Sequence, residues 1–262
     1  MSSAEQIKSC CAAAYSSDAV ALLLGDSYHP GGAILTRKLA TLLELSPGQR
    51  VADIASGPGA TARLLATEFA VTVEGVDIAA PVVPRAQEAA ARMGLTAEVR
   101  FHVGDSEALP FPDNTFDAVV TECAYCTFPD KVGAVTEFTR VLQPGGRLGL
   151  ADVTIADTGL PDELTTISAW VVCIADARPL TRYIDILTDA GLHVTHTESH
   201  DEALARMIDQ IEARLNLARM AFPQVLTEAG IDADAALGYI DIARRAVIDG
   251  LIGFALVVAH NP

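Results

Sequence analysis

Residues 51–62 read Val51-Ala52-Asp53-Ile54-Ala55-Ser56-Gly57-Pro58-Gly59-Ala60-Thr61-Ala62, a short apolar run followed by a glycine turn and the start of a helical pattern. A strand that enters a helix through glycines lets the backbone approach a ligand closely, and the first amides of the helix face that ligand. The stretch therefore predicts a site for a nucleotide-like cofactor. Because Gly57-Pro58-Gly59 lacks the third glycine of the dinucleotide fingerprint, the rest of the chain must decide which cofactor binds.

The composition indicates a globular protein that acts on a small molecule. Half of the 262 residues are hydrophobic and a fifth are charged, so the chain can bury a proper core. The net charge of -16 disfavours nucleic acid and anionic membranes as partners, because both would be repelled. The apolar run at residues 251–259 is too short to cross a bilayer, and no basic N-terminal region leads an apolar segment. We therefore expect a cytoplasmic protein.

Apolar runs alternate with helical patterns along most of the chain. This alternation predicts an α/β fold with a doubly wound, mostly parallel, seven-stranded sheet that has helices on both faces. The expected strands are residues 50–55, 71–77, 98–103, 117–122, 147–153, 192–198 and 251–259.

Further helical patterns lie outside this alternation. They occur at residues 4–24, 33–43, 162–175, 180–190 and 202–249. With no linker or repeat in the sequence, we expect a single domain over residues 1–262. Its parts would be an N-terminal helical cap (1–45), a cofactor-binding core (46–200), a helical insertion (201–250) and the last strand (251–262).

Three acidic residues fall where such a sheet binds ligands, beyond the carboxyl ends of its strands. Asp77 ends the second strand, where a carboxylate can accept hydrogen bonds from both ribose hydroxyls. Asp105 ends the third strand, where an acceptor can take the exocyclic amine of adenine, and Asp53 lies on the first strand. A single such Asp is usually a helix cap or turn residue, but three at successive strand ends indicate a nucleoside site.

Further motifs follow the glycine turn along the chain. They are Gly104-Asp105-Ser106-Glu107-Ala108-Leu109-Pro110-Phe111-Pro112-Asp113, Phe116-Asp117-Ala118-Val119-Val120 and Arg140-Val141-Leu142-Gln143-Pro144-Gly145-Gly146-Arg147-Leu148. Together with the turn and Asp77, this combination over residues 45–155 resembles the class I S-adenosylmethionine-dependent methyltransferases. The resemblance implies a Rossmann-like fold, S-adenosylmethionine as cofactor and a small-molecule methyl acceptor.

The resemblance also implies roles for individual residues. Gly57 and Gly59 would approach the methionine part of the cofactor, Asp77 would hold the ribose, and Asp105 with Ser106 would hold the adenine. Ala55 stands where the family usually has its first glycine, and because it adds only one methyl group we expect the turn to persist. The full set of residues expected at the cofactor is Asp53, Ala55, Gly57, Gly59, Asp77, Ile78, Gly104, Asp105, Ser106 and Glu122.

The five cysteines, at positions 10, 11, 123, 126 and 173, bear on the acceptor. Their layout is similar to that of the arsenite methyltransferases, in which separated cysteines bind trivalent arsenic. The resemblance makes Cys123 and Cys173 the expected pair, with Cys10 or Cys11 as a third ligand. Thiolates prefer soft centres, and the lone pair of trivalent arsenic can attack the methyl group without a base. The bland alternative is that the cysteines only pack in the core.

Two other functions are compatible with the same fold. An O-, N- or S-methyltransferase of a small organic metabolite would normally need a base, for which His29, Glu122 and Tyr125 are candidates by position. A non-catalytic protein that binds S-adenosylmethionine is the alternative from another class. No metal site is expected, because His193 and His196 fall three apart on a predicted strand and face opposite sides.

Overall fold

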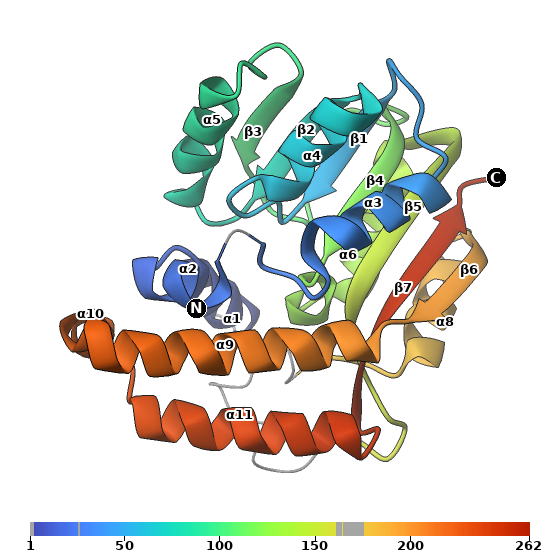
Figure 1. Ribbon diagram of the computed structural model, residues 1–262. Coiled ribbons are helices and arrows are strands. Elements are labelled where there is room, and N and C mark those ends of the chain that lie inside the picture. Colours follow the sequence, from blue (N-terminus) through green and yellow to red (C-terminus); the bar gives the residue numbers. More distant parts are fainter. Residues whose placement is uncertain (1–2, 26, 161–163, 165–175) are drawn as a thin grey trace.

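A seven-stranded sheet with the order β3-β2-β1-β4-β5-β7-β6 forms the centre of the molecule (Figure 1). The computed structural model describes residues 3–25, 27–160, 164 and 176–262. The strands are β1 (Arg50–Ile54), β2 (Thr72–Asp77), β3 (Val99–Val103), β4 (Phe116–Glu122), β5 (Leu142–Ile155), β6 (His193–Ser199) and β7 (Ile252–His260). β1 to β5 pair in parallel, whereas β7 runs antiparallel to both β5 and β6. The predicted mostly parallel sheet of seven strands is confirmed.

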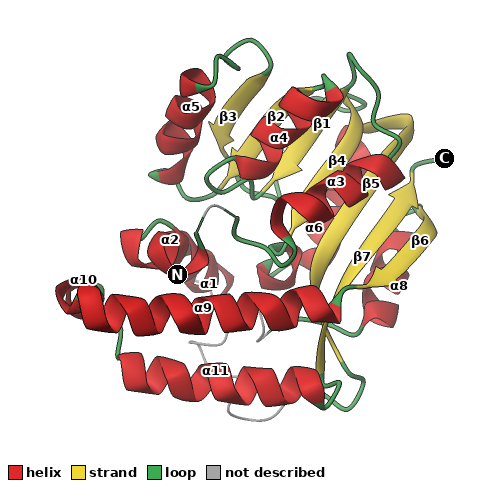
Figure 2. Cartoon of the chain, in the orientation of Figure 1, coloured by secondary structure: helices red, strands yellow, loops and turns green. Residues whose placement is uncertain are grey.

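Helices cover both faces of this sheet (Figure 2). The apolar core on one face includes side chains of α3 (Gly32–Leu42), α4 (Ala60–Phe69) and α5 (Val82–Arg92). The core on the other face includes side chains of α6 (Lys131–Val141) and α8 (Leu180–Asp189). Because both faces are covered, the central strands are largely buried, and four of the five residues of β1 are buried.

Two groups of helices lie over the carboxyl ends of the parallel strands (Figure 1). The first comprises α1 (Ser3–Tyr15) and α2 (Asp18–Leu24), and the second is the insertion between β6 and β7, with α9 (Asp201–Ala221), α10 (Pro223–Glu228) and α11 (Ala233–Ile248). The two groups are in contact, since Arg214 of α9 donates a hydrogen bond of 3.0 Å to the carbonyl oxygen of Leu23 at the end of α2. The helical insertion expected before the last strand is therefore present, and it lies over one end of the sheet.

The structure differs from the predicted helices in two places. The pattern at residues 4–24 is divided into α1 and α2, which are bent by 70°, because Ser17 caps the second helix by accepting the N–H of Val20 at 3.2 Å. The pattern at residues 202–249 is divided by Pro223, which begins α10, and by the Asp232 cap of α11. The helix expected at residues 162–175 lies, apart from Leu164, outside the described residues. Within the described part of the chain, no single helix is long and apolar enough to cross a membrane.

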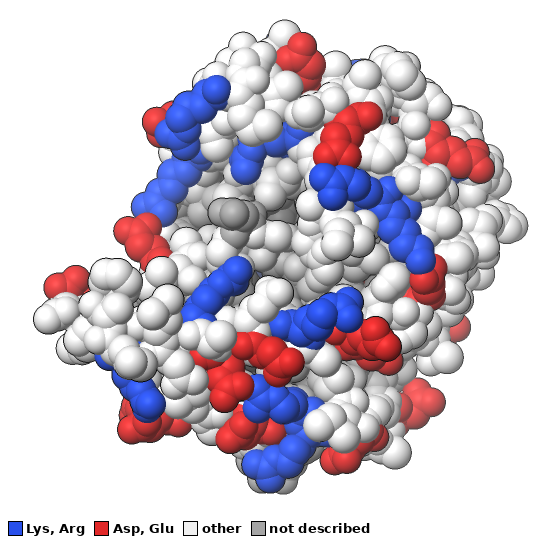
Figure 3. All heavy atoms as spheres, viewed as in Figure 1, with Lys and Arg blue, Asp and Glu red and all other residues white. Residues whose placement is uncertain are grey.

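Charged side chains of both signs share the face seen in Figure 3. Arg37 of α3 pairs with Glu68 of α4 at 2.7 Å, and Arg244 of α11 contacts Asp209 of α9 at 3.3 Å. Exposed pairs of this kind each contribute less than about 1 kcal/mol. Apolar packing beneath them therefore holds the helices in place.

Candidate functional site

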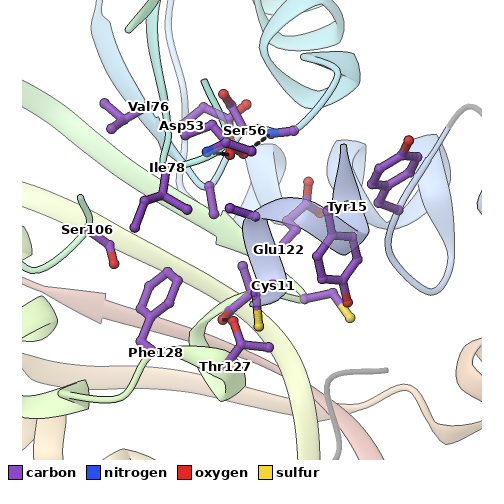
Figure 4. Close-up of a pocket in the computed structure, with 18 of the residues that line it drawn as sticks. Cys11, Tyr15, Asp53, Ser56, Val76, Ile78, Ser106, Glu122, Thr127 and Phe128 are labelled. Carbon is purple, nitrogen blue, oxygen red and sulfur yellow. Dashed lines mark hydrogen bonds between the residues drawn. The ribbon is translucent and has the colours of Figure 1, made fainter. Parts of the chain in front are cut away.

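A pocket opens where the strand order reverses, beyond the carboxyl ends of β1 and β4. Its walls come from the loops after β1, β2, β3 and β4, from α1 and from residues 27–29; Figure 4 shows part of this lining. This is the position at which doubly wound sheets bind ligands. We call it the cofactor pocket. The predicted site residues that line it are Cys11, His29, Asp53, Ala55, Gly57, Asp77, Ile78, Gly104, Asp105, Ser106, Glu122 and Cys123.

The turn after β1 has a backbone that favours glycine. Ala55, Gly57 and Gly59 all have a positive φ, of 57°, 51° and 76°. For a residue with a Cβ atom this left-handed conformation costs about 1 to 2 kcal/mol. Ala55 therefore holds a strained position at the edge of the pocket, and the turn forms in spite of it.

Gly59 does not line the pocket, contrary to the role predicted for it. Its place is next to Phe101 of β3, where a Cβ atom would lie 2.3 Å from the aromatic ring. Gly59 is required because α4 packs closely on the sheet there. Only Gly57 of the two glycines faces the expected cofactor, and a Cβ atom at Gly57 would come no closer than 3.9 Å to Tyr28.

The Asp77 carboxylate at the end of β2 holds the glycine turn in place. Its Oδ2 accepts the backbone N–H of Gly57 at 2.8 Å, and its Oδ1 accepts that of Ala79 at 2.8 Å. Burial raises the pKa of Asp77, and the two hydrogen bonds act in the opposite direction. Each carboxylate oxygen has a second lone pair, so it can also accept a ribose hydroxyl.

Three buried polar atoms in this pocket lack a hydrogen-bond partner within the described chain: Ser27 Oγ, Asp53 Oδ2 and Ser56 Oγ. Burial, followed by the charges of Glu122 and Asp77, raises the pKa of Asp53 well above its ordinary value. Buried polar atoms cost free energy unless they are paired, so the pocket is suited to a ligand that brings positive charge and hydrogen-bond donors. The α-ammonium group of S-adenosylmethionine meets that requirement.

Asp105 and Ser106 lie on the side of the pocket formed by the loop after β3. In Figure 4, Ser106 and Ile78 occupy one side and Tyr15 the other. Asp105 Oδ2 accepts a hydrogen bond of 2.7 Å from Nζ of Lys8, which also pairs with Glu107. Burial alone would lower the pKa of Lys8, but the hydrogen bonds to the two carboxylates outweigh it and raise that pKa. Lys8 thus ties α1 to the loop predicted to hold the adenine.

Glu122, at the end of β4, is the centre of a buried polar cluster. Its carboxylate accepts the hydroxyl of Thr61 at 2.6 Å and that of Thr36 at 3.0 Å. Nε2 of His29 lies 3.4 Å from Glu122 Oε2, and the two side chains are only 7% and 3% exposed. The other ring nitrogen of His29, Nδ1, lies 3.1 Å from the carbonyl oxygen of Pro30. Because a carbonyl oxygen can only accept a hydrogen bond, Nδ1 carries a proton. The other nitrogen, Nε2, faces the buried polar cluster around Glu122.

The cysteines are separated by the fold. Cys11 and Cys123 both line the cofactor pocket, whereas Cys10 is exposed on the other side of α1 and does not line it. Cys126 is buried in the apolar core that includes side chains of α3, α4 and α5. Cys173 lies outside the described residues, so the expected pair with Cys123 is not seen. As the helical geometry requires, only one of the adjacent cysteines 10 and 11 faces inward.

Tyr125 was a candidate base, and the structure corrects this prediction. The ring is only 1% exposed, and its hydroxyl donates a hydrogen bond of 3.1 Å to the carbonyl oxygen of Lys131. Burial raises the pKa of this hydroxyl further. Tyr125 is a core residue that packs against Phe128 and Tyr183, not a group that reaches the pocket.

A second cavity, of 460 Å³, adjoins the cofactor pocket. It lies among α2, α9, α11 and the sheet, and its lining is dominated by aliphatic side chains such as Leu204, Ile208 and Ile240. Three residues, Tyr15, Tyr28 and Cys123, line both spaces. We call this space the apolar cavity.

Several pocket residues were not predicted from the sequence. Lys8, Tyr15 and Tyr28 come from the N-terminal segment, and Ser56 and Thr61 come from the glycine turn and the first turn of α4. The position of Ser56 within the turn was a usable signal. Apart from Cys11, the residues that α1 contributes have no sequence signal, because only tertiary contacts place that helix over the pocket.

The comparison with known families now decides the type of domain. Residues 52–150 match the model of the family described as "Methyltransferase domain". Residues 52–150 are thus similar to a methyltransferase domain. This domain contains the glycine turn, Asp77, Asp105 and Glu122, and it uses S-adenosylmethionine as its cofactor.

Relatives of the methyltransferase domain carry out varied reactions. Methyltransferase GfsG of Streptomyces halstedii is 31% identical over 170 residues, which cover 64% of this chain and 61% of that protein. The 27-O-demethylrifamycin SV methyltransferase of Amycolatopsis mediterranei is 33% identical over 169 residues, covering 63% of this chain and 61% of that protein. The match thus spans less than two thirds of either relative.

A solved structure has the same fold as this chain. It is phosphoethanolamine N-methyltransferase 2 of Haemonchus contortus in complex with phosphomonomethylethanolamine and S-adenosylhomocysteine. The TM-score is 0.79 at 20% identity, and the match covers 93% of this chain and 56% of that one. At this identity the likeness shows the fold alone.

Proposed function

We propose that this protein is an S-adenosylmethionine-dependent methyltransferase that transfers a methyl group to an oxygen of a small organic molecule. One observation carries the proposal. The pocket that holds the unpaired Asp53 Oδ2 and Ser56 Oγ also holds the buried pair His29 and Glu122. A site for a cationic cofactor and a candidate base thus share one wall.

Different residues of the pocket would bind the cofactor and accept the proton of the acceptor. Asp53, Ser56 and Asp77 bind the cofactor, whose sulfonium group supplies the activated methyl group when it is bound. His29 would take the proton of the acceptor hydroxyl at Nε2, so that the hydroxyl oxygen could receive the methyl group that the bound cofactor would supply. The Glu122 carboxylate, 3.4 Å from Nε2, stabilises the imidazolium that results. The Amycolatopsis relative, named for a substrate that lacks an O-methyl group, supports an oxygen acceptor.

The substitution His29→Ala tests this proposal. With radiolabelled S-adenosylmethionine and a panel of phenols and alcohols, we expect turnover to fall by roughly 10²- to 10⁴-fold. The dissociation constant for S-adenosylhomocysteine, measured by calorimetry, should change by less than about threefold, because His29 does not hold the cofactor. Undiminished turnover in the variant would reject His29 as the base.

A second candidate acceptor is trivalent arsenic, which the shared position of Cys11 and Cys123 favours. The Cys11→Ser and Cys123→Ser variants separate the two acceptors. If arsenite is the acceptor, each change should abolish its methylation, because a hydroxyl is a hard ligand that stays protonated. If the acceptor is organic, the same variants should keep at least about a third of the turnover.

A protein that binds the cofactor without turnover remains the alternative outcome of the same assay. Such a protein would be stabilised against unfolding when it binds S-adenosylmethionine, yet it would methylate no compound in the panel. Ligand-induced stabilisation measures the binding step separately, since a ligand at a hundred times its dissociation constant adds about 2.7 kcal/mol. The proposed acceptor is a small molecule, and the proposed location is the cytoplasm.

A further inference from the structure

We infer that the apolar cavity is the acceptor site and that the acceptor is an uncharged, lipophilic alcohol or phenol of considerable length. The inference rests on the proposed methyl transfer and specifies its substrate class. Its starting point is the volume of 460 Å³, which lies within the range of about 300 to 1,000 Å³ typical of pockets for drug-sized ligands.

The lining of the cavity excludes a charged ligand body. Among the described residues that line it, none is Lys, Arg or His, so a phosphate or carboxylate would find no cation. Among the lining residues that the structure describes, the single acidic one is Asp232, and it is already engaged: its Oδ1 accepts the backbone N–H groups of Asp234 and Ala235 as the cap of α11. A charge in this space would lose its hydration without replacement. The hydrocarbon part of a ligand would gain free energy there instead.

The connection to the cofactor pocket gives the ligand a direction. Tyr15, Tyr28 and Cys123 line both spaces, so one end of a ligand in the cavity lies next to the cofactor pocket. His29 lines the cofactor pocket and the adjacent Pro30 lines the cavity, so the candidate base stands at the same junction. A hydroxyl at the end of an apolar body is the group that this arrangement presents to Nε2 of His29. The remainder of the ligand then extends between α9 and α11.

A homologous series of 4-alkylphenols, from methyl to dodecyl, tests the inference. Burial of each methylene contributes about 0.8 kcal/mol, so the dissociation constant should fall about threefold to fourfold per carbon until the cavity is full. The 4-alkylbenzoates of equal length should bind at least tenfold more weakly, because their carboxylate would take the place of the hydroxyl beside the buried Glu122 carboxylate. Binding is measured by calorimetry in the presence of S-adenosylhomocysteine, and methyl transfer with labelled cofactor.

Two substitutions in the lining should shift the preferred chain length in opposite directions. Ala243→Phe fills part of the cavity, so octylphenol and longer members should bind at least tenfold more weakly while cresol is unaffected. Ile211→Ala enlarges the cavity and should move the optimum to longer chains. Ala213→Phe is the matched control, since Ala213 lies exposed on α9 outside the lining. The affinity for S-adenosylhomocysteine and the melting temperature show that each variant is folded.

The outcomes separate this inference from the proposed function. Length-dependent binding that follows the two lining variants, without methyl transfer, would support the acceptor site and reject the proposed reaction. Methyl transfer to short, polar hydroxyl compounds, with no dependence on alkyl length and no effect of Ala243→Phe or Ile211→Ala, would overturn the apolar acceptor and keep the reaction. Length-dependent binding that Ala213→Phe alters as much as Ala243→Phe would also overturn the assignment to this cavity.

Discussion

The Asp77 carboxylate accepts the backbone N–H of Gly57 at 2.8 Å, which links the end of β2 to the turn after β1 across the cofactor pocket. One side chain thereby fixes the glycine turn and also presents oxygens to the ligand. The loss of Asp77 should therefore affect both the shape of the site and its direct contacts.

Asp77→Ala should weaken S-adenosylmethionine binding by roughly tenfold to a hundredfold. Hydrogen bonds to a charged group contribute about 1.5 to 3 kcal/mol, which corresponds to that range. Titration calorimetry measures the change. Asp117→Ala is a control on β4 away from the pocket, and it should leave the dissociation constant unaltered. A constant unchanged in Asp77→Ala would show that this carboxylate does not hold the ribose.

Asp53→Asn should stabilise the ligand-free protein and weaken cofactor binding. The raised pKa means that the folded state retains a proton which the unfolded state loses above pH 3.8, so stability falls as pH rises from 3.8 through the higher folded pKa. Asparagine removes this pH-dependent loss, and we expect a gain of about 1 kcal/mol at neutral pH, or roughly 2 to 4 °C in melting temperature. The difference between variant and wild type should vanish in acid.

The matched control for this change is Asp152→Asn. Asp152 is also buried, but its carboxylate accepts the backbone N–H groups of Ala124, Cys126 and Val153. An amide nitrogen would meet a donor there, so this variant should be destabilised by about 1 to 3 kcal/mol. If both variants change the free energy of unfolding in the same direction, burial of a carboxylate oxygen without a hydrogen-bond partner does not explain the behaviour of Asp53.

Ala55→Gly should raise the melting temperature. Relief of the left-handed conformation gains about 1 to 2 kcal/mol, from which the greater entropy of glycine in the unfolded chain subtracts about 0.4 to 1 kcal/mol. Ala70, with a φ of 53° at the end of α4, offers the same backbone change away from the pocket. Calorimetry should show similar stabilisation in both variants, with cofactor affinity altered only at position 55. No gain at either position would argue against strain.

Lys8→Met should accelerate the release of S-adenosylhomocysteine. The lysine ties α1 to Asp105 and Glu107, and because these groups are partly exposed the expected effect is about twofold to fivefold. Added salt should speed release in the wild type by screening the pair, and should do so much less in the variant. Stopped-flow displacement measures both rates. If salt changes the release rate equally in the two proteins, the ion pairs of Lys8 do not control release.

The sequence predicted the sheet more completely than the site. Strand periodicity and the spacing of Asp53, Asp77 and Asp105 depend on local patterns that a chain displays directly, and all three side chains line one pocket. Gly59 was misjudged because its neighbour Phe101 is on another strand. Tyr125 was misjudged because burial is a property of packing, and Lys8 was missed because nothing local reveals where α1 docks.

The helical insertion enters and leaves the sheet at a single point. The backbone N–H of His200 donates to the carbonyl oxygen of Phe254, and the N–H of Phe254 donates to Asp201 at 2.8 Å. The two ends of the inserted segment are held together by these hydrogen bonds. Such a segment can change in length or composition at little entropic cost, because closure entropy grows only slowly with loop length. We expect the register of β6 and β7 to persist when the helices between them are changed. Under the proposed function, exchange of this one segment would alter much of the lining of the apolar cavity and so change the acceptor, while the glycine turn and Asp77 of the cofactor pocket stay as they are.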